Sequence, residues 1–435
     1  MESKAKMSFW AAVLMSINII IGAGIFAGPQ RITELAGDVG FLIWPLVSLL
    51  MFPIVWGVVQ ASRVFPGEGG FYNYCSQGIN KVMGFVAQWC YMLGYLATAA
   101  AITASLRNDL ASSINIEIIT QHPHLFDALV VAFFTALNLL ALGVISKLQS
   151  TITIFKLLPL FFVVGLLAWY WNPFAVTYGH AQFSGLCLAI PSALFAYWGF
   201  EACCSIGHLL EGGPRQVGKV ALTAFGLVTV TYMFFHLSLI HIMGSGNLTA
   251  FGVLAFPGFM KLSAAMTSFI STVIVGSIFL CYCGTIFGTS LANITNIFTL
   301  ARQKVIIGGG ALTKTNAWGR PTIAGLVYGI VLWLFLVAVT NKYVLMALAN
   351  IGICSALTLT LVALLLFYLR KQNYLQVLIT LVGLGSASIT FYYIWMAIGT
   401  NLWERSMAVM PLVALLGVGL VLYAIQQRVG APSRR

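Results

Sequence analysis

The sequence predicts an all-α polytopic membrane protein with about twelve transmembrane helices. Only 7% of the 435 residues are charged and 60% are hydrophobic, whereas a soluble globular protein carries roughly 25% charged residues. Apolar runs of the length that crosses a bilayer, about 20 residues, follow one another along the whole chain. We place them at about 8–32, 40–63, 82–106, 127–146, 149–171, 184–209, 219–243, 265–298, 322–340, 344–369, 375–398 and 408–427.

The distribution of charge predicts the orientation of these spans. If the N-terminus lies in the cytoplasm, sixteen lysines and arginines fall in inner segments, and five fall in outer ones: Arg31, Arg107, Lys261, Lys342 and Arg405. Cytoplasmic loops of membrane proteins carry such an excess of basic residues. We therefore expect a multi-pass protein of the cell membrane, surrounded by lipid, with both termini in the cytoplasm. The net charge of +12 then reflects orientation, and we expect no nucleic-acid partner.

Span one is interrupted by glycines. The stretch "NIIIGAGIFAGPQ", Asn18 to Gln30, places Gly22 and Gly24 inside an apolar run. Unwinding a helix within hydrocarbon leaves backbone groups without partners, which is tolerated only around a cavity or ligand. The half-helix after the break would offer free amides and the positive end of its dipole to a carboxylate. The half-helix before it would end in free carbonyls that suit an ammonium group. Alternatively, the glycines only allow close helix packing.

Spans two to five contain one further unusual feature, a lysine in span five. The glycine-rich loop "FPGEGGFYNYC" (Phe65 to Cys75) separates spans two and three. Lys156 lies about seven residues from the inner end of span five, roughly 10 Å at 1.5 Å per residue. One interpretation is a side chain whose long stem returns to the cytoplasmic interface. The other is an internal cation, since intramembrane charges often mark functional sites.

Span six holds a second candidate break. In "SALFAYWGFEACCSIGH", Ser192 to His208, Gly199 lies near mid-span and Glu201 follows it. Two broken helices that face each other would form a receptor for an α-amino acid without any charged side chain. Glu201 is the only acid that we assign to the interior of a span. It is either a hydrogen-bonding anchor of the break or a residue of gating or coupling.

The remaining spans complete a predicted repeat. The loops "EGGPRQVGK" (Glu211 to Lys219) and "ARQKVIIGGGALTKTNAWGRP" (Ala301 to Pro321) separate spans six and seven, and spans eight and nine. Because the second break lies five spans after the first, an odd number, the second unit would be inserted with inverted topology. We predict a single transmembrane domain, 1–435, made of five-helix repeats at 8–171 and 184–369 and two peripheral helices at 375–427.

Five motifs resemble segments of the amino acid–polyamine–organocation superfamily. They are "IIGAGIFAGP" in span one, "FPGEGGFYNY" after span two, "STITIFKLLPL" in span five, "LFAYWGFE" in span six and "LTKTNAWGRP" after span eight. The resemblance covers spans one to ten. It implies a leucine-transporter-type fold, a 5+5 inverted repeat with broken helices 1 and 6. The substrate would lie near the bilayer midplane between spans one, three, six and eight.

The resemblance also implies a set of site residues. The substrate carboxylate would be bound by the backbone amides of Gly22, Ala23 and Gly24. The amino group would be bound by the backbone carbonyls of Ile20, Phe195, Ala196 and Trp198, and Phe195 would be an aromatic gate. The ammonium of Lys156 would occupy the place of sodium in related sodium-coupled folds, with Thr289 and Ser290 as neighbours on span eight. The sequence departs from the family where Ala23 replaces a frequent serine, in "GPRQVGK" after span six, and in "ARQK" after span eight.

These observations predict a sodium-independent secondary transporter of amino acids that works by alternating access, through exchange or proton-coupled symport. The alternative within the class is an antiporter of polyamines or of an amino acid and its amine. A remote alternative from another class is a polytopic membrane enzyme or receptor. The enzyme would need a catalytic cluster such as HExxH or an acid pair, which the sequence lacks, and no channel filter is visible. The cysteines lack the CxxC spacing of metal ligands, so we expect no metal and no cofactor. The sequence leaves the oligomeric state open.

Overall fold

The computed structural model of the chain is built from helices over the residues that it describes, which are 6–22, 24–113, 119, 121–169, 181–260, 262–399 and 401–429. In chain order the α-helices are α1 (Phe9–Ile20), α2 (Gly24–Ala36), α3 (Ile43–Val64), α4 (Phe71–Gly78), α5 (Lys81–Ser113), α7 (Pro123–Leu137), α8 (Leu142–Trp169), α9 (Phe183–Phe195), α10 (Cys203–Ile206), α11 (Val217–Met243), α12 (Ser245–Phe251), α13 (Ala264–Arg302), α14 (Gly309–Leu312), α15 (Thr322–Ala338), α16 (Lys342–Arg370), α17 (Tyr374–Ile398) and α18 (Leu402–Val429).

The helices match the predicted fold class. Nine helical segments of the described chain are long and apolar enough to cross a membrane, and the shorter apolar helices α1, α7 and α15 accompany them. The longest segment, Gly24–Val64, joins α2, the 3-10 helix η1 (Gly37–Leu42) and α3. Each predicted span therefore has a helical counterpart. The prediction of an all-α polytopic membrane protein is confirmed.

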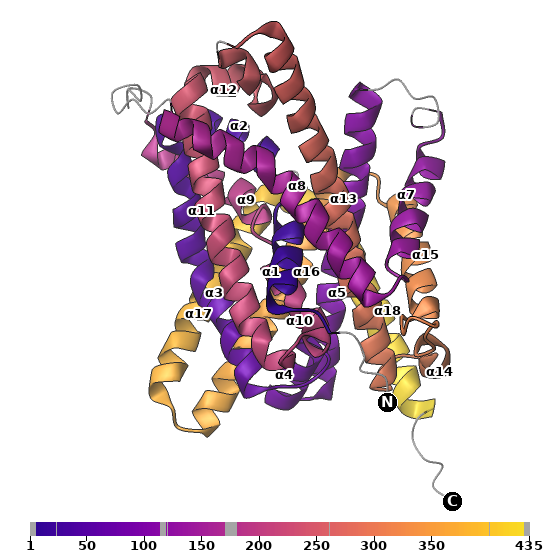
Figure 1. The fold of residues 1–435 in the computed structure, drawn as a ribbon. Helices are drawn as coiled ribbons and strands as arrows, with labels where there is room; N and C mark the ends of the chain where they lie inside the picture. Colours follow the sequence, from indigo (N-terminus) through magenta and orange to yellow (C-terminus); the bar gives the residue numbers. More distant parts are fainter. Residues whose placement is uncertain are drawn as a thin grey trace, which may run out of the picture.

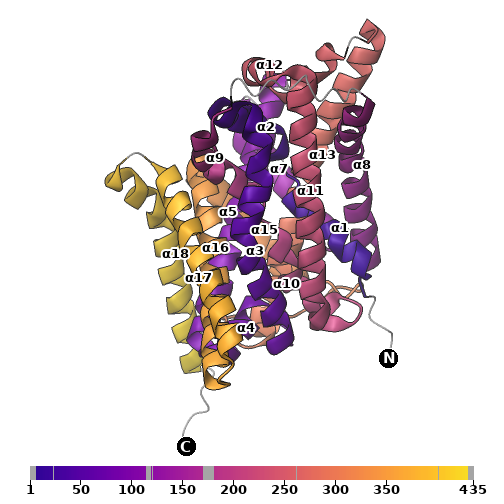
Figure 2. The same ribbon diagram turned by 90° about the vertical axis from the view of Figure 1, so that its left-hand side faces the viewer.

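The helices form one bundle with α1 inside it. α1 is in contact with α8, α11 and α13 (Figure 1). α1 begins and α18 ends at the end of the bundle that carries α4 and α14, while α12 lies at the opposite end (Figures 1 and 2). α17 and α18 lie along one side of the bundle (Figure 2), where both pack on α16. This arrangement surrounds the broken span one with other helices.

Span one is broken at its glycines, as the sequence predicted. α1 ends at Ile20, and α2 begins at Gly24. Ile21 has φ −77° and ψ 79°, the conformation of an inverse γ-turn. The amide of Gly22 accordingly donates to the Ile20 carbonyl two residues back, at 2.9 Å. The turn redirects the chain between the two half-helices. Ala23 lies outside the described residues.

Span six is broken at the predicted place as well. α9 ends at Phe195, and Gly199 has φ +126° before the 3-10 helix η3 (Phe200–Ala202) leads into α10. A residue with a Cβ would be strained at this φ. A Cβ at Gly199 would also lie 2.8 Å from the backbone nitrogen of Ile20. Glycine therefore allows the two breaks to pack directly against each other.

The predicted position of span four, 127–146, is wrong. α7 ends at Leu137 and α8 begins at Leu142, so the prediction runs across a turn. The side-chain amide of Asn138 donates to one carbonyl in α7 and to one in α13. Nε of Arg320 donates to the Asn138 carbonyl at 3.2 Å. Burial lowers the pKa of Arg320 to about 10, so the guanidinium stays charged at neutral pH beside the negative end of α7.

The apolar character of this turn explains the error. The segment "LNLLALGVI" (Leu137 to Ile145) is as apolar as the helices on either side. Asn138 and Gly143 are its only sequence signals for a chain reversal. The groups that cap the end of α7 come from the loop before α15, far along the chain. Local pattern could not reveal them.

Candidate functional site

The two helix breaks line one cavity. It is small, with about 20 Å³ open to the centre of a water molecule, which is enough for about one water. Its lining residues come from spans one, three, six and eight: Ile19, Ile20, Gly22, Gly24, Thr98, Ile102, Phe195, Ala196, Trp198 and Thr285. Among the described residues that line it, none is charged. A ligand here would be recognised by backbone groups and by a few neutral side chains.

Most of the predicted substrate site meets at this cavity. Six residues predicted from the resemblance line it: Ile20, Gly22, Gly24, Phe195, Ala196 and Trp198. Sequence reasoning missed Thr98 and Ile102 on α5 and Thr285 on α13. Their residue types are common in apolar helices, so only the assembled bundle reveals their position. Whether the backbone groups of this set bind a carboxylate and an ammonium stays a prediction.

Lys156 holds the end of the first half-helix. Its side chain is fully buried, and Nζ donates to the carbonyl oxygens of Asn18 and Ile21, each at 2.6 Å. The last carbonyls of a helix have no partner within that helix and carry the negative end of its dipole. The ammonium provides both a donor and a positive charge there. The side chain therefore does not return to the interface, and that interpretation is excluded.

The predicted neighbours of Lys156 on α13 do not meet its ammonium. The hydroxyl of Thr289 donates to the Thr285 carbonyl of its own helix at 2.7 Å, and the hydroxyl of Ser290 donates to the Tyr328 hydroxyl at 3.3 Å. Thr285, one turn earlier, lies at the break instead, with its hydroxyl 3.5 Å from the Asn18 carbonyl oxygen. Serine and threonine in apolar helices commonly bond the carbonyl four residues back. The α13 residue that contacts the Asn18 carbonyl, Thr285, thus lies one helical turn before the predicted pair.

A tyrosine that sequence reasoning missed connects the two breaks. Tyr232 on α11 is fully buried. Its hydroxyl lies 3.0 Å from the Ile20 carbonyl oxygen and 3.1 Å from the Ala196 carbonyl oxygen. One hydroxyl thus lies within hydrogen-bonding distance of a carbonyl in each broken helix. In the sequence "VTVTYMFFH" this tyrosine looks like any core aromatic, so no local signal could have identified it.

A buried histidine, His236, forms hydrogen bonds between the helices that pack around Tyr232. The indole N–H of Trp44 can only donate, and it lies 3.1 Å from Nδ1 of His236. Nδ1 is therefore unprotonated, and Nε2 carries the ring proton. Nε2 lies 2.9 Å from the Thr33 hydroxyl and so donates to it. His236 is a neutral structural residue that joins α2, α3 and α11, with the ring of Trp44 packed against Tyr232.

Glu201 binds to the second break. Its side chain is fully buried. One carboxyl oxygen accepts the backbone N–H of Gly199 at 3.0 Å, and the other accepts the hydroxyl of Tyr95 on α5 at 3.0 Å. This geometry is that of a hydrogen-bonding anchor for the break. A role in gating or coupling stays a prediction.

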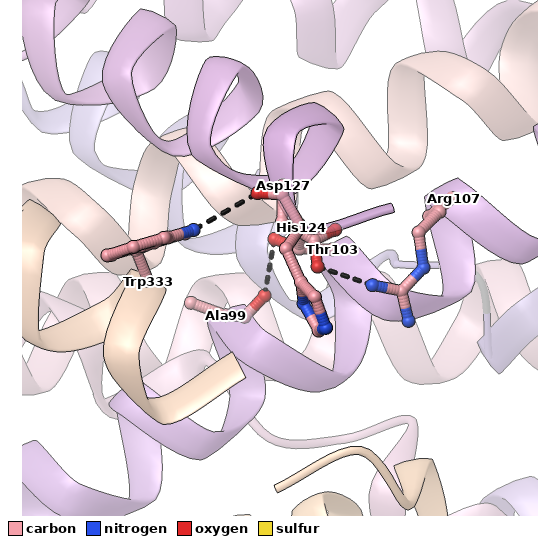
Figure 3. A network of polar contacts seen from close by, with 6 residues as sticks. All are labelled: Ala99, Thr103, Arg107, His124, Asp127 and Trp333. Atoms are coloured by element: carbon pink, nitrogen blue, oxygen red, sulfur yellow. Dashed lines mark hydrogen bonds and ion pairs between the residues drawn. The ribbon is translucent and has the colours of Figure 1, made fainter. Parts of the chain in front are cut away.

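A polar network connects α5 with α7 and α15 (Figure 3). Arg107 forms an ion pair with Asp127 of α7. The indole N–H of Trp333 on α15 donates to the His124 carbonyl at 3.0 Å. Asp127 lies within α7 and is fully buried. The network joins spans three, four and nine, and so positions the helix that carries Thr98 and Ile102.

Chain segments from four places meet at the opposite end of the bundle. The N–H of Met7 donates to the Leu209 carbonyl at 2.8 Å, and the Met7 carbonyl accepts the N–H of Glu211 at 2.9 Å. Arg302 at the end of α13 lies 3.1 Å from the carboxylate of Glu68 in the loop before α4. The segment that leads into α1 is therefore fastened to the segment that follows α10.

The sequence was compared with known proteins. The family model described as "Amino acid permease" matches residues 7–423. The chain is similar to the serine/threonine exchanger SteT of Bacillus subtilis (strain 168), with 21% identity over 351 residues, 78% of this chain and 77% of that protein.

Two yeast proteins are similar over shorter regions. The histidine permease of Saccharomyces cerevisiae is 24% identical over 248 residues, 50% of this chain and 39% of that protein. The general amino-acid permease GAP1 of the same organism is 22% identical over 282 residues, 60% of this chain and 45% of that protein. The matched regions thus span less than half the length of either yeast protein.

Proposed function

The chain belongs to the amino acid permease family, and from this premise we propose that it is a sodium-independent secondary transporter of amino acids. It works by alternating access, through exchange or proton-coupled symport. The relatives named above are transporters or permeases of amino acids by their names, and the family is one of transporters and not of enzymes. We place the protein in the cell membrane with both termini in the cytoplasm, on the distribution of its basic residues.

The observation that carries the proposal is the position of Lys156. Its ammonium lies at the end of α1, 2.6 Å from two carbonyl oxygens, in the region where the resemblance places sodium in related folds. Two cations within a few ångströms of each other in a low-dielectric interior repel strongly. The lysine ammonium therefore occupies the place of the sodium ion, and transport requires no sodium.

The cavity offers groups for both ends of an α-amino acid. α2 begins at Gly24, so its first amides and its positive dipole end suit the carboxylate. The carbonyls of Phe195 and Trp198 in the second break suit the amino group. The Ile20 carbonyl already accepts from the hydroxyl of Tyr232 and from the N–H of Gly22. The Ala196 carbonyl faces the hydroxyl of Tyr232 and has a second lone pair for the substrate.

A polyamine fits this site less well. Its second ammonium would need a carboxylate, and none lines the cavity among the described residues. Both carboxyl oxygens of Glu201 accept hydrogen bonds from Tyr95 and Gly199. An unpaired charge in such a site is strongly unfavourable. We therefore propose a neutral amino acid as the substrate and set aside the polyamine alternative.

Uptake by purified protein in proteoliposomes tests this function. A panel of labelled amino acids, with putrescine as the polyamine probe, is offered to vesicles preloaded with unlabelled amino acid and to empty vesicles with an imposed pH gradient. We expect uptake of neutral amino acids in one of the two formats and none of putrescine. The format that supports uptake distinguishes exchange from proton symport. Uptake of putrescine alone, or of no amino acid in either format, would overturn the proposal.

A further inference from the structure

One buried donor on a residue that lines the cavity has no acceptor among the described residues. Trp198 is 5% exposed and lines the cavity. Its indole N–H has no hydrogen-bond partner among the described residues. An indole nitrogen is a donor only, and buried donors are nearly always paired with protein or water. The position is therefore one where a bound molecule can supply the missing acceptor.

The two threonine hydroxyls among the described lining residues already have acceptors. The hydroxyl of Thr98 donates to the Gly94 carbonyl at 2.9 Å. The hydroxyl of Thr285 is directed to the Asn18 carbonyl, at the longer distance of 3.5 Å. Trp198 thus provides the one uncommitted side-chain donor among the described lining residues. A substrate side chain with an acceptor atom would meet it, whereas an aliphatic side chain would leave the N–H unpaired.

The lining also limits the charge and size of that side chain. No charged side chain lines the cavity among the described residues, and the ammonium of Lys156 lies behind the carbonyls of Asn18 and Ile21. A cationic side chain would be repelled, and an anionic one would find no charged partner in the wall. The small volume of the cavity, about 20 Å³ open to the centre of a water molecule, favours a small ligand.

We propose that the indole N–H of Trp198 determines specificity by donating to the side chain of the substrate. The substrate is then a small neutral amino acid whose side chain carries a hydrogen-bond acceptor, such as serine or threonine. This inference rests on the proposed function, because it assigns a substrate class to the same cavity. It names a selectivity, and that selectivity is measurable separately from transport.

Isosteric pairs of amino acids test the proposal. Threonine and valine have the same shape, and so the ratio of their affinities isolates the hydroxyl group. We expect wild-type protein to bind threonine about tenfold more tightly than valine, the usual value of one hydrogen bond. Trp198→Phe keeps an aromatic ring and removes the N–H, and should bring the ratio close to one. The control is Trp89→Phe, because the Trp89 indole donates to the Leu415 carbonyl outside the cavity lining; it should keep the wild-type ratio.

A second measurement needs no variant. O-methylserine and norvaline have nearly the same size, but only the first has a side-chain oxygen, and that oxygen can accept but not donate. If Trp198 donates to the substrate, wild-type protein binds O-methylserine several-fold more tightly than norvaline. Equal affinities would show that an acceptor oxygen in the side chain adds no affinity and would overturn the proposal.

Other outcomes contradict the proposal in distinct ways. If Trp198→Phe weakens threonine and valine equally, the N–H serves a part common to all amino acids, and Trp198 sets no side-chain selectivity. The proposal is refuted directly if Trp198→Phe leaves the threonine-to-valine affinity ratio unchanged. It is also refuted if wild-type protein does not prefer threonine to valine. Binding of no amino acid at all to wild type would instead refute the proposed function.

Discussion

Lys156 donates to the carbonyls of Asn18 and Ile21 at 2.6 Å each, and so its removal should affect the first break. Lys156→Ala leaves two buried carbonyls without their donor, at a cost of about 1–3 kcal/mol each. We expect uptake to fall sharply while substrate binding persists, several-fold weaker. Lys156→Arg should restore little, because a planar guanidinium does not fit a site for a compact ammonium. Uptake and binding are measured side by side.

The matched control for Lys156 lies on the same helix. Lys147 is an exposed residue near the start of α8, and Lys147→Ala removes a lysine without touching the break. Its uptake should equal that of wild type. Near-normal uptake in Lys156→Ala would show that the ammonium is dispensable and would remove it from the mechanism.

A bulky residue at Gly24 should block the cavity. A Cβ at this position would lie 3.4 Å from the Cβ of Ala196, so the rest of a leucine side chain would enter the space between the two breaks. We expect Gly24→Leu to abolish uptake while the protein still inserts and remains monodisperse on size-exclusion chromatography. In Gly165→Leu, the control, the added Cβ meets open space, and uptake should persist. Wild-type uptake and affinity in Gly24→Leu would refute the carboxylate site.

At the scale of elements, the hydroxyl of Tyr232 contacts a carbonyl in each of the two broken helices. Tyr232→Phe removes the donor that faces the Ile20 and Ala196 carbonyls and keeps the ring. We expect a loss of stability of about 1–3 kcal/mol, seen as a lower thermal unfolding temperature that added substrate partly restores. Tyr374→Phe, at an exposed tyrosine, is the control and should unfold like wild type. An unchanged unfolding temperature in Tyr232→Phe would show that the hydroxyl does not stabilise the breaks.

The breaks themselves could be predicted from sequence, because glycine in an apolar span is a strong local signal. Gly22, Gly24 and Gly199 lie at the two interruptions. The boundary between spans four and five could not be predicted, because its turn is apolar and its caps come from a distant loop. For the same reason Tyr232 was missed: a hydrogen bond from a buried side chain to a distant carbonyl leaves no pattern along the chain.

For Lys156, the sequence predicted the buried charge but not its neighbours on the adjacent helix. A lysine inside an apolar span indicated an internal cation, and the structure places its ammonium at the first break. The α13 residue that reaches the same Asn18 carbonyl is Thr285, one turn before the predicted Thr289 and Ser290. Residue type and approximate depth are visible in a sequence, but the rotation of one long helix against another depends on packing.

At the scale of the whole molecule, the pairing of Met7 with the chain after α10 connects spans one and six at one end of the bundle. The alternating access that we propose requires this end to open. Met7→Pro removes the N–H that binds the Leu209 carbonyl and should favour the open state. The buried thiol of Cys204 in α10 then reacts faster with an alkylating reagent, measured by mass spectrometry of its peptide. Met7→Leu keeps the backbone bond and should react like wild type; equal rates in both variants would contradict this role.

The central claim is that a resident ammonium replaces the transported cation, and the ion dependence of uptake tests it most directly. Initial rates for the best neutral amino acid substrate are measured in proteoliposomes, with external sodium replaced stepwise by choline at constant ionic strength. Because Lys156 already provides the positive charge at the Asn18 and Ile21 carbonyls, the account predicts the same rate at every sodium concentration. A steep, saturable requirement for sodium would contradict it.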